Sequence, residues 1–484
     1  MPRPPRPGPR RAAPRAGRRK PRGDVERPVR HDLVDALVLE VHGLVHDQGW
    51  LADRALERAL RRERNLWSAE RRAVAEAVYG VTRWQGQLDW LLGAGIPDTE
   101  ADDHALSSAE AGARVGRRGR GSTVDLSTRY AAWLVRRDGV APGEAARRVA
   151  SSPRALAALD GADARIAAIA DPVERLAVEA SLPRWIAARF ASELGLEEAR
   201  TLARAMNERA PLTVRANLLR VPDREALRAR LAAEGVAAEP TRFSPWGLVL
   251  DGRENAFALA SFREGLFEIQ DEGSQLIALA CGARPGKLVV DACAGAGGKA
   301  LALAAEMHNK GTLWALDSDA DRLGEARRRA TRDRVDNLRT RVIGAGPEAD
   351  AQLSDLAGKA DVVLVDAPCS GLGTLRRKPD ARWRLAPSDP ERFAALQRTL
   401  VARFGALVRS GGRLVYATCA IGAAENDDVA DLVARELPFE PAPLTPLLGE
   451  ERAAALGAEG NRLRLYPHRQ GTDGFFLASF VRRS

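Results

Sequence analysis

The sequence predicts an α/β domain built on a parallel sheet in the C-terminal part of the chain, preceded by an all-helical domain and a small α+β subdomain. Strand-like and helix-like segments alternate from residue 286 to the end, as they do when crossover helices join parallel strands. Apolar residues recur at three-four spacing between residues 32 and 208, which is typical of amphipathic helices. Residues 211–219 alternate with a period of two, which favours a strand.

The domains are predicted in the following order. We expect a disordered basic arm over 1–30, an all-helical domain over 31–175, linker helices and the α+β subdomain over 176–280, and the α/β domain over 281–484. A polar loop over 95–129 interrupts the helical pattern, and a helix over 224–234 and a strand over 246–250 complete the subdomain. In the α/β domain we expect strands at 287–293, 312–317, 361–368 and 413–419, a helix over 300–306, and a long helix ending at Val408.

Composition limits the class of protein. The chain has 484 residues with 45% hydrophobic and 29% charged residues, typical of a soluble globular protein. No run approaches the ~18 apolar residues of a membrane span, and the N-terminus has no signal-peptide core, so we expect a cytoplasmic protein without membrane contact. Its four cysteines form no CxxC pair, which excludes a disulfide framework or zinc site, so we expect no metal. We also expect a monomer.

The net charge of +9 favours a polyanionic partner, because Lys and Arg release counterions when they neutralise phosphates. Eleven of the basic residues lie in the arm over 1–30. A solvated basic surface would give the same net charge, so both interpretations stay open.

A glycine-rich turn, DACAGAGGK, follows the strand that ends at Asp291 and precedes a helix, so its backbone can approach a ligand closely. A phosphate-binding P-loop is excluded because Cys293 and Ala300 stand where its first Gly and its Ser or Thr belong. A dinucleotide-binding fingerprint is weakened, because Ala300 stands where its third Gly belongs. S-adenosylmethionine is the third candidate ligand for this loop. Asp317, at the end of the next strand, suits the ribose hydroxyls of either cofactor.

Two cysteines follow strand ends: Cys369 comes after Asp366-Ala-Pro, and Cys419 follows a second strand. If these strands are neighbours, both thiols, Asp366 and the glycine loop meet in one cleft. A thiolate that adds to C6 of cytosine activates C5 for methylation, a carboxyl group at N3 stabilises the adduct, and a second base removes the C5 proton. The cytosine must be flipped out of any helix. We expect Cys281 to be a core residue and Cys293 to offer mainly its backbone.

These motifs resemble the 5-methylcytosine RNA methyltransferase family, specifically its bacterial RsmB-like branch that acts on 16S ribosomal RNA. The segments that carry the resemblance are EIQDEGSQ (268–275), DACAGAGGK (291–299), DAPCSGLGTLRRKPD (366–380), YATCAIGAAEN (416–426) and DGFF (473–476). The resemblance implies a Rossmann-like S-adenosylmethionine-dependent domain that makes 5-methylcytosine. It also implies that Cys419 is the nucleophile and that Cys369 assists release of the product.

By the same resemblance, S-adenosylmethionine is bound by Asp317 and by the loop residues Cys293, Ala294, Gly295, Ala296, Gly297, Gly298 and Lys299, while Asp366 lies between cofactor and cytosine. Lys299 points towards the active site in this family. Two positions depart from the family: Gly295-Ala296 replace Ala-Pro, and Ala345 replaces the acid that reaches the adenine, with Asp350 the nearest acid.

The helical part resembles the NusB-like RNA-binding domain of RsmB-like enzymes, best at residues 82–92. A helical packing domain without RNA contact is the alternative. In the subdomain that follows, Arg215 and Asn217 are candidate RNA contacts. The basic loop 375–384 could hold RNA phosphates or stack Trp383 on a base.

The main hypothesis is therefore an S-adenosylmethionine-dependent methyltransferase whose partner is ribosomal RNA. A NusB-like assembly factor with a degenerate transferase half and a transfer-RNA 5-methylcytosine methyltransferase are the alternatives. An NAD-dependent oxidoreductase is a third, but it leaves the paired cysteines unexplained.

Overall fold

The computed structural model describes residues 28–96, 124–251, 255–344, 346 and 348–484. Nearly all of the predicted basic arm, most of the predicted loop over 95–129 and Ala345 lie outside these residues. Among the described helices, none has the length and apolar character needed to cross a bilayer.

The N-terminal part is the helical domain, and every regular element described in it is a helix, as predicted. Its elements are α1 (His31–Gln48), α2 (Ala52–Arg62), α3 (Ser68–Leu91), α4 (Leu126–Arg137), α5 (Pro142–Arg148), α6 (Pro153–Leu156), η1 (Ala157–Leu159), α7 (Ala162–Ala167) and α8 (Pro172–Ala180). The apolar faces of α1, α3 and α4 bury residues such as Val41, Val78 and Leu134 in one core. The polar caps Asp125 and Asp171 accept backbone N–H groups where α4 and α8 begin.

Two linker helices, α9 (Arg184–Leu194) and α10 (Leu196–Ala205), lead into the small subdomain. Its elements are β1 (Thr213–Ala216), α11 (Arg224–Ala233), β2 (Ala238–Pro240), β3 (Gly247–Leu250), η2 (Ala256–Ala258), α12 (Ala260–Arg263) and β4 (Phe267–Ile269). The strands pair antiparallel in the order β2-β3-β1-β4. The predicted α+β character is correct, and the predicted elements start or end within two or three residues of the observed ones.

The C-terminal part is the sheet domain. It comprises α13 (Glu272–Cys281), β5 (Lys287–Asp291), α14 (Gly298–Glu306), β6 (Gly311–Asp317), α15 (Ala320–Asp333), β7 (Leu338–Val342), α16 (Glu348–Gln352), β8 (Ala360–Asp366), η3 (Leu372–Thr374), η4 (Pro379–Trp383), α17 (Asp389–Gly405), β9 (Val408–Thr418), η5 (Ala423–Glu425), α18 (Asp427–Glu436), β10 (Phe439–Pro441), α19 (Thr445–Leu448), α20 (Glu450–Leu456), β11 (Arg462–Leu465), α21 (Pro467–Gln470) and β12 (Phe475–Arg482).

The strand order of this sheet is β10-β12-β9-β8-β5-β6-β7, with β11 beside β12. Strands β7, β6, β5, β8 and β9 run parallel, whereas β12 is antiparallel to β9. The parallel sheet is thus confirmed, with an antiparallel edge that the sequence pattern did not predict. The predicted long helix ends at Gly405 rather than at Val408, because Val408 already pairs with Ala360 of β8.

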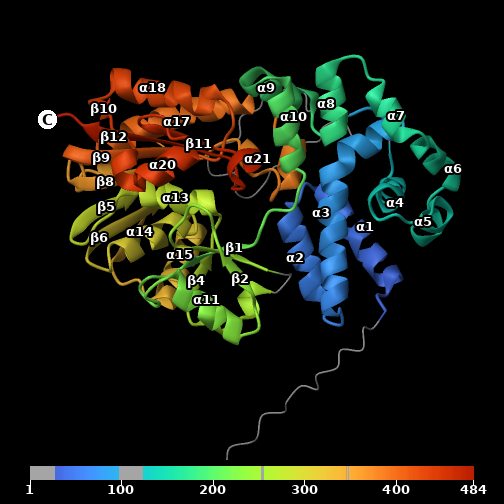
Figure 1. The fold of residues 1–484 in the computed structure, drawn as a ribbon, viewed down its shortest axis with the longest axis horizontal. Coiled ribbons are helices and arrows are strands. Elements are labelled where there is room, and N and C mark those ends of the chain that lie inside the picture. Colours follow the sequence, from blue (N-terminus) through green and yellow to red (C-terminus); the bar gives the residue numbers. More distant parts are fainter. Residues whose placement is uncertain (1–27, 97–123, 252–254, 345, 347) are drawn as a thin grey trace, which may run out of the picture.

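Both faces of the sheet are buried, which explains why its strands are almost continuously apolar. Val289 of β5 packs on one face with α13 and α14, and the next residue, Val290, packs on the other face with α17 and α18. The result is a Rossmann-like sandwich of three layers (Figure 1).

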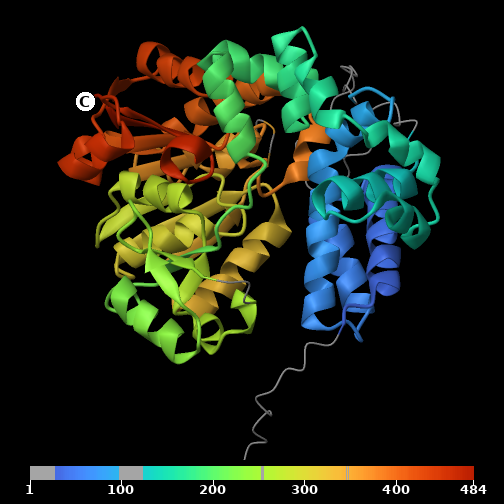
Figure 2. The ribbon, with the colours of Figure 1, turned by 45° about the vertical axis from the view of Figure 1, so that its right-hand side comes forward.

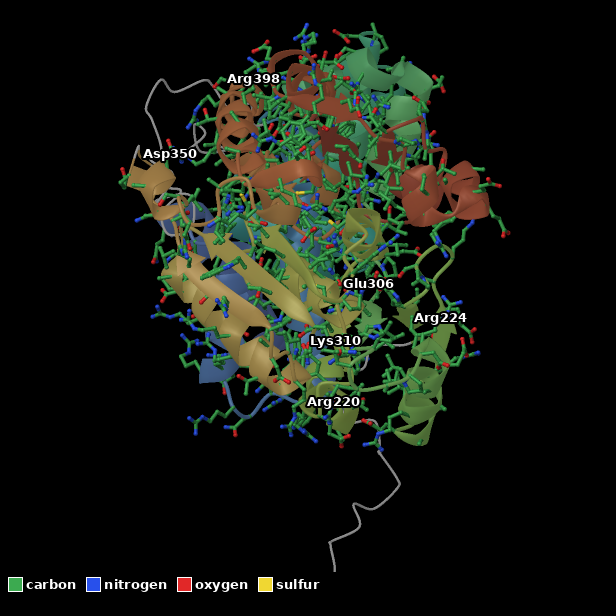
Figure 3. The ribbon with its side chains drawn as sticks, turned by 90° about the vertical axis from the view of Figure 1, so that its left-hand side faces the viewer. Arg220, Arg224, Glu306, Lys310, Asp350 and Arg398 are labelled. Atoms are coloured by element: carbon green, nitrogen blue, oxygen red, sulfur yellow. The ribbon has the colours of Figure 1, made fainter. Side chains whose placement is uncertain are left out.

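The helical domain and the sheet domain lie side by side, and α8–α10 cross above the space between them (Figures 1 and 2). In the side view, Arg220 and Arg224 of the small subdomain lie at one end of the molecule and Arg398 of α17 at the other (Figure 3). The predicted divisions at 175 and 280 fall within α8 and α13, so domain limits at those residues stay predictions.

Candidate active site

The glycine-rich loop joins β5 to α14 by a tight turn. Gly295 and Gly297 have φ values of +53° and +83°, in the left-handed region that favours glycine. A Cβ at Gly297 would lie 2.9 Å from the Cβ of Ala326, so the close packing of α15 against the loop also requires glycine at this position. The side chain of Arg329 donates to the carbonyl of Ala296 at 2.7 Å and fixes the turn from outside. The loop therefore offers backbone N–H groups at a helix N-terminus with open space beside Gly295.

Two carboxylates face this loop. The carboxylate of Asp317 accepts the N–H of Gly295 at 2.7 Å and that of Asp319 at 2.9 Å, which ties the end of β6 to the loop. Asp291 is 1% exposed, and neither of its side-chain oxygens has a hydrogen-bond partner among the described residues. Burial, with a further contribution from Asp366, raises the pKa of Asp291 to about 7. The backbone N–H of Ala300 lies near enough to lower this pKa slightly, and a buried carboxyl group with no closer donor favours a polar ligand beside the loop.

The two thiols predicted to converge do so. Strands β8 and β9 are parallel neighbours, and Asp366 is in register with Ala417. The Sγ atoms of Cys369 and Cys419 are 3.2 Å apart and both cysteines are free. The N–H of Cys419 also donates to Sγ of Cys369 at 3.3 Å. The side-chain hydrogen bond with Cys419, followed by burial, raises the pKa of the Cys369 thiol well above its usual range.

The backbone on both sides of Cys369 is held by two buried polar side chains. The N–H of Ser370 donates to Oε1 of Glu425 at 2.8 Å, and Nε2 of Gln397 donates to the carbonyl of Pro368 at 2.9 Å. Gln397 also donates to Glu425 at 3.1 Å. Glu425 and Gln397 are 1% and 0% exposed. Sequence reasoning missed both; Glu425 stands in the quoted motif YATCAIGAAEN, but its pairing partner lies 55 residues earlier.

The loop at Cys419 is held by different contacts. The hydroxyl of Thr418 donates to Oδ1 of Asn426 at 2.6 Å, and Nδ2 of Asn426 donates to the carbonyl of Ala420 at 3.3 Å. The carbonyl of Cys419 accepts the N–H of Gly373 at 2.8 Å. These bonds fix the backbone at Cys419, while its side chain faces Cys369.

Lys299 and Asp366 form an ion pair between the glycine loop and the thiols. Nζ of Lys299 lies 2.6 Å from Oδ2 of Asp366, and both side chains are largely buried. Burial would lower the pKa of Lys299, but Asp366, together with Asp291 and Cys419, raises it instead. The ammonium group is therefore charged, and the predicted orientation of Lys299 towards the site is observed.

The other two cysteines differ from this pair. Cys281 is fully buried in the core, as expected, and its thiol donates to the carbonyl of Ile277. Cys293 lies in the glycine loop, where burial, with Asp317, raises its pKa well above the usual range. A protonated thiol is no nucleophile, which agrees with a backbone role for Cys293.

The expectation that Arg215 and Asn217 contact RNA is wrong. Both are 2% exposed: Nε of Arg215 donates to Gln270, and Asn217 donates to the carbonyls of Gly265 and Asp333. Burial lowers the pKa of Arg215. Both side chains join the small subdomain to the sheet domain instead.

The basic loop 375–384 is also not a free RNA-binding loop. Arg376 and Arg377 pair with Asp473 of the DGFF motif and with Asp271. Trp383 donates from Nε1 to the carbonyl of Thr82 at 2.7 Å and lies so close to Gly86 of α3 that a Cβ there would clash. The sequence showed only charge, and the structure shows an interface between domains. Within this loop only Lys378 is exposed.

The acid nearest to Ala345 in the sequence is engaged elsewhere. Asp350 pairs with Arg403 of α17 at 2.9 Å, and its side chain is 69% exposed. Ala345 itself lies outside the described residues.

The chain matches two descriptions of protein families. "16S rRNA methyltransferase RsmB/F" matches residues 278–481, and "Methyltr_RsmF/B-like, ferredoxin-like domain" matches residues 182–256. The probable ribosomal RNA small subunit methyltransferase B of Bacillus subtilis is 35% identical over 331 residues, which cover 65% of this chain and 70% of the relative. The ribosomal RNA small subunit methyltransferase B of Xylella fastidiosa (strain 9a5c) is 36% identical over 64% and 71% of the two chains.

Solved structures share the fold. The protein PH0851 superposes with a TM-score of 0.70 at 24% identity and covers 94% of this chain and 99% of its own. A methyltransferase homolog protein from Pyrococcus horikoshii is 28% identical with a TM-score of 0.54, over 65% of this chain and all of its own. NSun6 from the same organism, solved with SFG, has a TM-score of 0.55 at 21% identity, over 62% of this chain and 98% of its own.

Proposed function

The chain belongs to the RsmB/F family of 16S rRNA methyltransferases, and from that premise we propose that it methylates C5 of a cytosine in ribosomal RNA through a covalent Cys419–C6 adduct. The observation that carries this proposal is the pair of thiols 3.2 Å apart, beside the Lys299–Asp366 ion pair.

The cofactor of this family is S-adenosylmethionine, and the residues present fit it. The glycine loop has open space beside Gly295 and leads into the N-terminus of α14, which suits the methionine half. Asp317 ends β6 where a ribose would lie, and Asp291 is buried beside the loop. The loop residues Cys293 to Lys299, with Asp317 and Asp366, would hold it. When bound, it supplies an electrophilic methyl group on a sulfonium centre.

Cys419 is the proposed nucleophile. The pKa of Cys369 is raised, so Cys369 retains its proton and can donate a hydrogen bond to its neighbour's sulfur. The Lys299 ammonium lies close enough for Cys419 to influence its pKa. A thiolate at position 419 therefore has both a hydrogen-bond donor and a cation nearby, as a cysteine nucleophile requires.

Asp366 and Cys369 take the acid–base roles. Addition of Sγ of Cys419 to C6 moves an electron pair to N3, which takes a proton from the Lys299–Asp366 pair, and Asp366 then accepts a hydrogen bond from the new N3–H. After C5 has gained the methyl group, Cys369 gives its proton to water, and the resulting thiolate, a strong base because its pKa is raised, takes the C5 proton. The Sγ–C6 bond then breaks, its electron pair returns to Cys419, and N3 gives its proton back to the Lys299–Asp366 pair.

Ribosomal RNA is the proposed partner, with the NusB-like helical domain as a second RNA-binding region, and we propose a cytoplasmic monomer. The complete set of Cys369, Cys419, Asp366 and Lys299 favours a working transferase over an assembly factor with a degenerate transferase half.

The test uses the full chain, tritiated S-adenosylmethionine and 16S rRNA from a strain that lacks this protein. We expect one labelled cytosine, identified as 5-methylcytosine by nucleoside mass spectrometry and located by bisulfite sequencing. Transfer RNA from the same strain serves as the competing substrate. A methyl group on any atom other than C5, or on transfer RNA alone, would overturn the proposal.

A further inference from the structure

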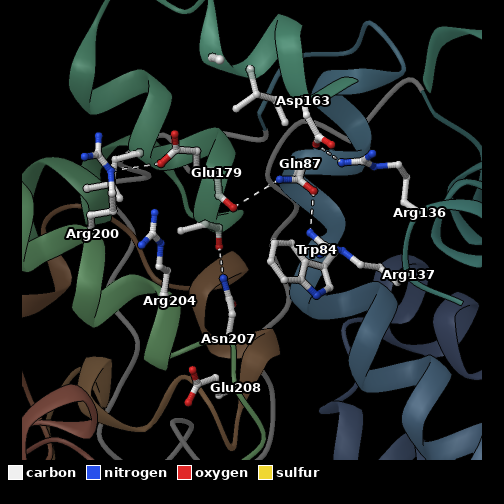
Figure 4. A pocket seen from close by; sticks show the side chains of 14 residues that line it. Trp84, Gln87, Arg136, Arg137, Asp163, Glu179, Arg200, Arg204, Asn207 and Glu208 are labelled. Carbon is white, nitrogen blue, oxygen red and sulfur yellow. Dashed lines mark hydrogen bonds and ion pairs between the residues drawn. The ribbon is translucent and has the colours of Figure 1, made fainter. Parts of the chain in front are cut away.

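A pocket of about 460 Å³ lies where the helical domain meets linker helix α10 (Figure 4). It is lined from α3, α4, α7, α8 and α10, far along the chain from the thiols. Its polar lining consists of four arginines, three carboxylates, two amides and one indole: Arg136, Arg137, Arg200, Arg204, Asp163, Glu179, Glu208, Gln87, Asn207 and Trp84.

Two of the four arginines are paired inside the pocket. Arg136 pairs with Asp163 at 2.6 Å, and Arg200 pairs with Glu179 at 3.3 Å and with Glu197 outside it at 2.9 Å. Nε of Arg200 is the atom that pairs with Glu179, whereas Nε of Arg136 is buried and makes no hydrogen bond to any described residue. Buried guanidinium N–H groups are normally satisfied, so the pocket retains one unused donor at Arg136.

The other two arginines, Arg137 and Arg204, have no carboxylate partner among the described residues. Arg137 stacks on the ring of Trp84 at 3.4 Å and donates from Nη2 to Oε1 of Gln87 at 2.8 Å. Burial of the guanidinium against these neighbours, with a smaller contribution from Arg136, lowers the pKa of Arg137 to about 10. Arg204 is exposed and lies across the pocket from Trp84 (Figure 4). Arg137 makes no ion pair with a described residue, although the charge of Asp163 reaches it, and it faces a second cation that makes none, so the place between them suits an anion.

We propose that this pocket binds a phosphodiester group of the RNA substrate, between Arg137 and Arg204. The proposal rests on the function proposed above for the choice of RNA as the polyanion. Guanidinium groups match phosphate in shape and charge. The Trp84 ring, on which Arg137 stacks, is an aromatic surface of the kind on which an unpaired base can pack.

The pocket also connects to the loop that follows Cys369. Nδ2 of Asn207, which lines the pocket, donates to the carbonyl of Ala180, and its Oδ1 accepts from Nη1 of Arg382 at 2.9 Å. Arg382 also donates to the carbonyl of Ser181 at 3.1 Å. A strand of RNA held here is therefore fixed relative to the loop 375–384 and, through it, to the active site.

The experiment measures binding of a short fluorescein-labelled single-stranded RNA to the full chain by anisotropy over a range of salt concentrations. For the double variant Arg137→Gln/Arg204→Glu, we expect Kd to rise about tenfold or more. The slope of log Kd against log salt should fall by about 0.7 for each phosphate that the variant no longer neutralises. Single variants separate the stacked arginine from the one across the pocket.

Arg147→Glu is the matched control, because Arg147 is exposed on α5 of the same domain and does not line the pocket. Equal RNA affinity and salt slope for the pocket variants and this control would overturn the proposal. Equal displacement of the RNA by poly-glutamate would also overturn it, because the pocket would then accept any acidic chain. Arg204→Glu alone keeps the test valid if Arg137→Gln does not fold.

Methylation and cofactor binding distinguish this proposal from the proposed function. The pocket variants should raise KM for RNA, leave kcat within about twofold, and bind S-adenosylmethionine as the parent chain does. If the parent chain binds RNA through the pocket but methylates no cytosine, the proposed function fails and the pocket stands. If it methylates cytosine and the pocket variants match the control, only the pocket fails.

Discussion

Strands β8 and β9 end side by side and are both followed by a cysteine, yet the two thiols have different surroundings. The peptide groups on both sides of Cys369 are held by Gln397 and Glu425, and the negative charge of Glu425 helps to raise the pKa of this thiol. Cys419 instead faces the thiol of Cys369 and interacts with the Lys299 ammonium. The same residue in equivalent topological positions is therefore prepared for two different roles by its neighbours.

The difference predicts which substitution has the largest effect. Cys419→Ala should abolish methylation, by roughly 10⁴-fold or more, because no other thiolate is placed to attack C6. Tritium incorporation into RNA measures the rate, and a denaturing gel should show no covalent protein–RNA complex. Appreciable turnover by this variant would mean that the two thiols have equivalent roles.

Cys369→Ala should leave attack intact and block release. We expect a covalent RNA adduct that survives denaturing electrophoresis, with turnover reduced roughly 10²- to 10⁴-fold through loss of acid–base help. The double variant Cys369→Ala/Cys419→Ala should form no adduct. An adduct with Cys419→Ala and none with Cys369→Ala would reverse the assignment.

Lys299→Gln tests the contribution of the Lys299 ammonium, which lies near Cys419. Removal of the ammonium leaves Asp366 without its partner and the attacking thiolate without a nearby cation, so kcat should fall about 10- to 100-fold. Single-turnover kinetics with saturating RNA measure this effect. Lys310→Gln, at an exposed lysine in the loop between α14 and β6, is the control and should match the parent chain.

Glu425→Gln should have the smallest effect of the four substitutions, and it should act through the environment of Cys369. The amide can still accept the N–H of Ser370, but the negative charge is gone, so the pKa of Cys369 should fall. The pH at which Cys369 is alkylated should move downwards, as read by mass spectrometry of its peptide after iodoacetamide. Burial raises the pKa of Glu425 itself, so the difference should fade as the pH drops through that value and the parent carboxyl is also neutral.

Glu436→Gln on α18 is the matched control, because Glu436 is exposed and lies at the far end of its helix from Glu425. An alkylation curve that moves equally with both substitutions, or upwards with Glu425→Gln, would contradict the assigned influence of Glu425.

The sequence predicted the part of the site that follows from topology. Asp366, Cys369 and Cys419 come directly after apolar strands, and parallel strands bring such positions to one edge of the sheet. It could not predict the residues that distinguish the thiols. Glu425 and Gln397 act through contacts with residues 55 and 29 positions away, which no local pattern encodes.

The failures also have a common physical cause. Arg215 and Trp383 belong to residue types that occur in RNA-binding surfaces, and composition is the same whether such a side chain faces solvent or another domain. Arg215 is buried against Gln270, and Trp383 packs against α3, so their surroundings depend on how domains pack. Long-range packing of this kind is not written in periodicity or spacing.

Arg382 connects the sheet domain to α8 and to the segment after α10, so these parts of the chain do not fold independently of one another. Burial lowers the pKa of this guanidinium to about 9, and the carbonyls of Ala180 and Ser181, with Asn207, are its acceptors. A truncated chain that begins after the helical domain would lack the packing of Trp383 on α3 and leave the segment just downstream of Cys369 without its support. We therefore expect that the sheet domain does not function alone, because the helical domain supports the segment that follows Cys369.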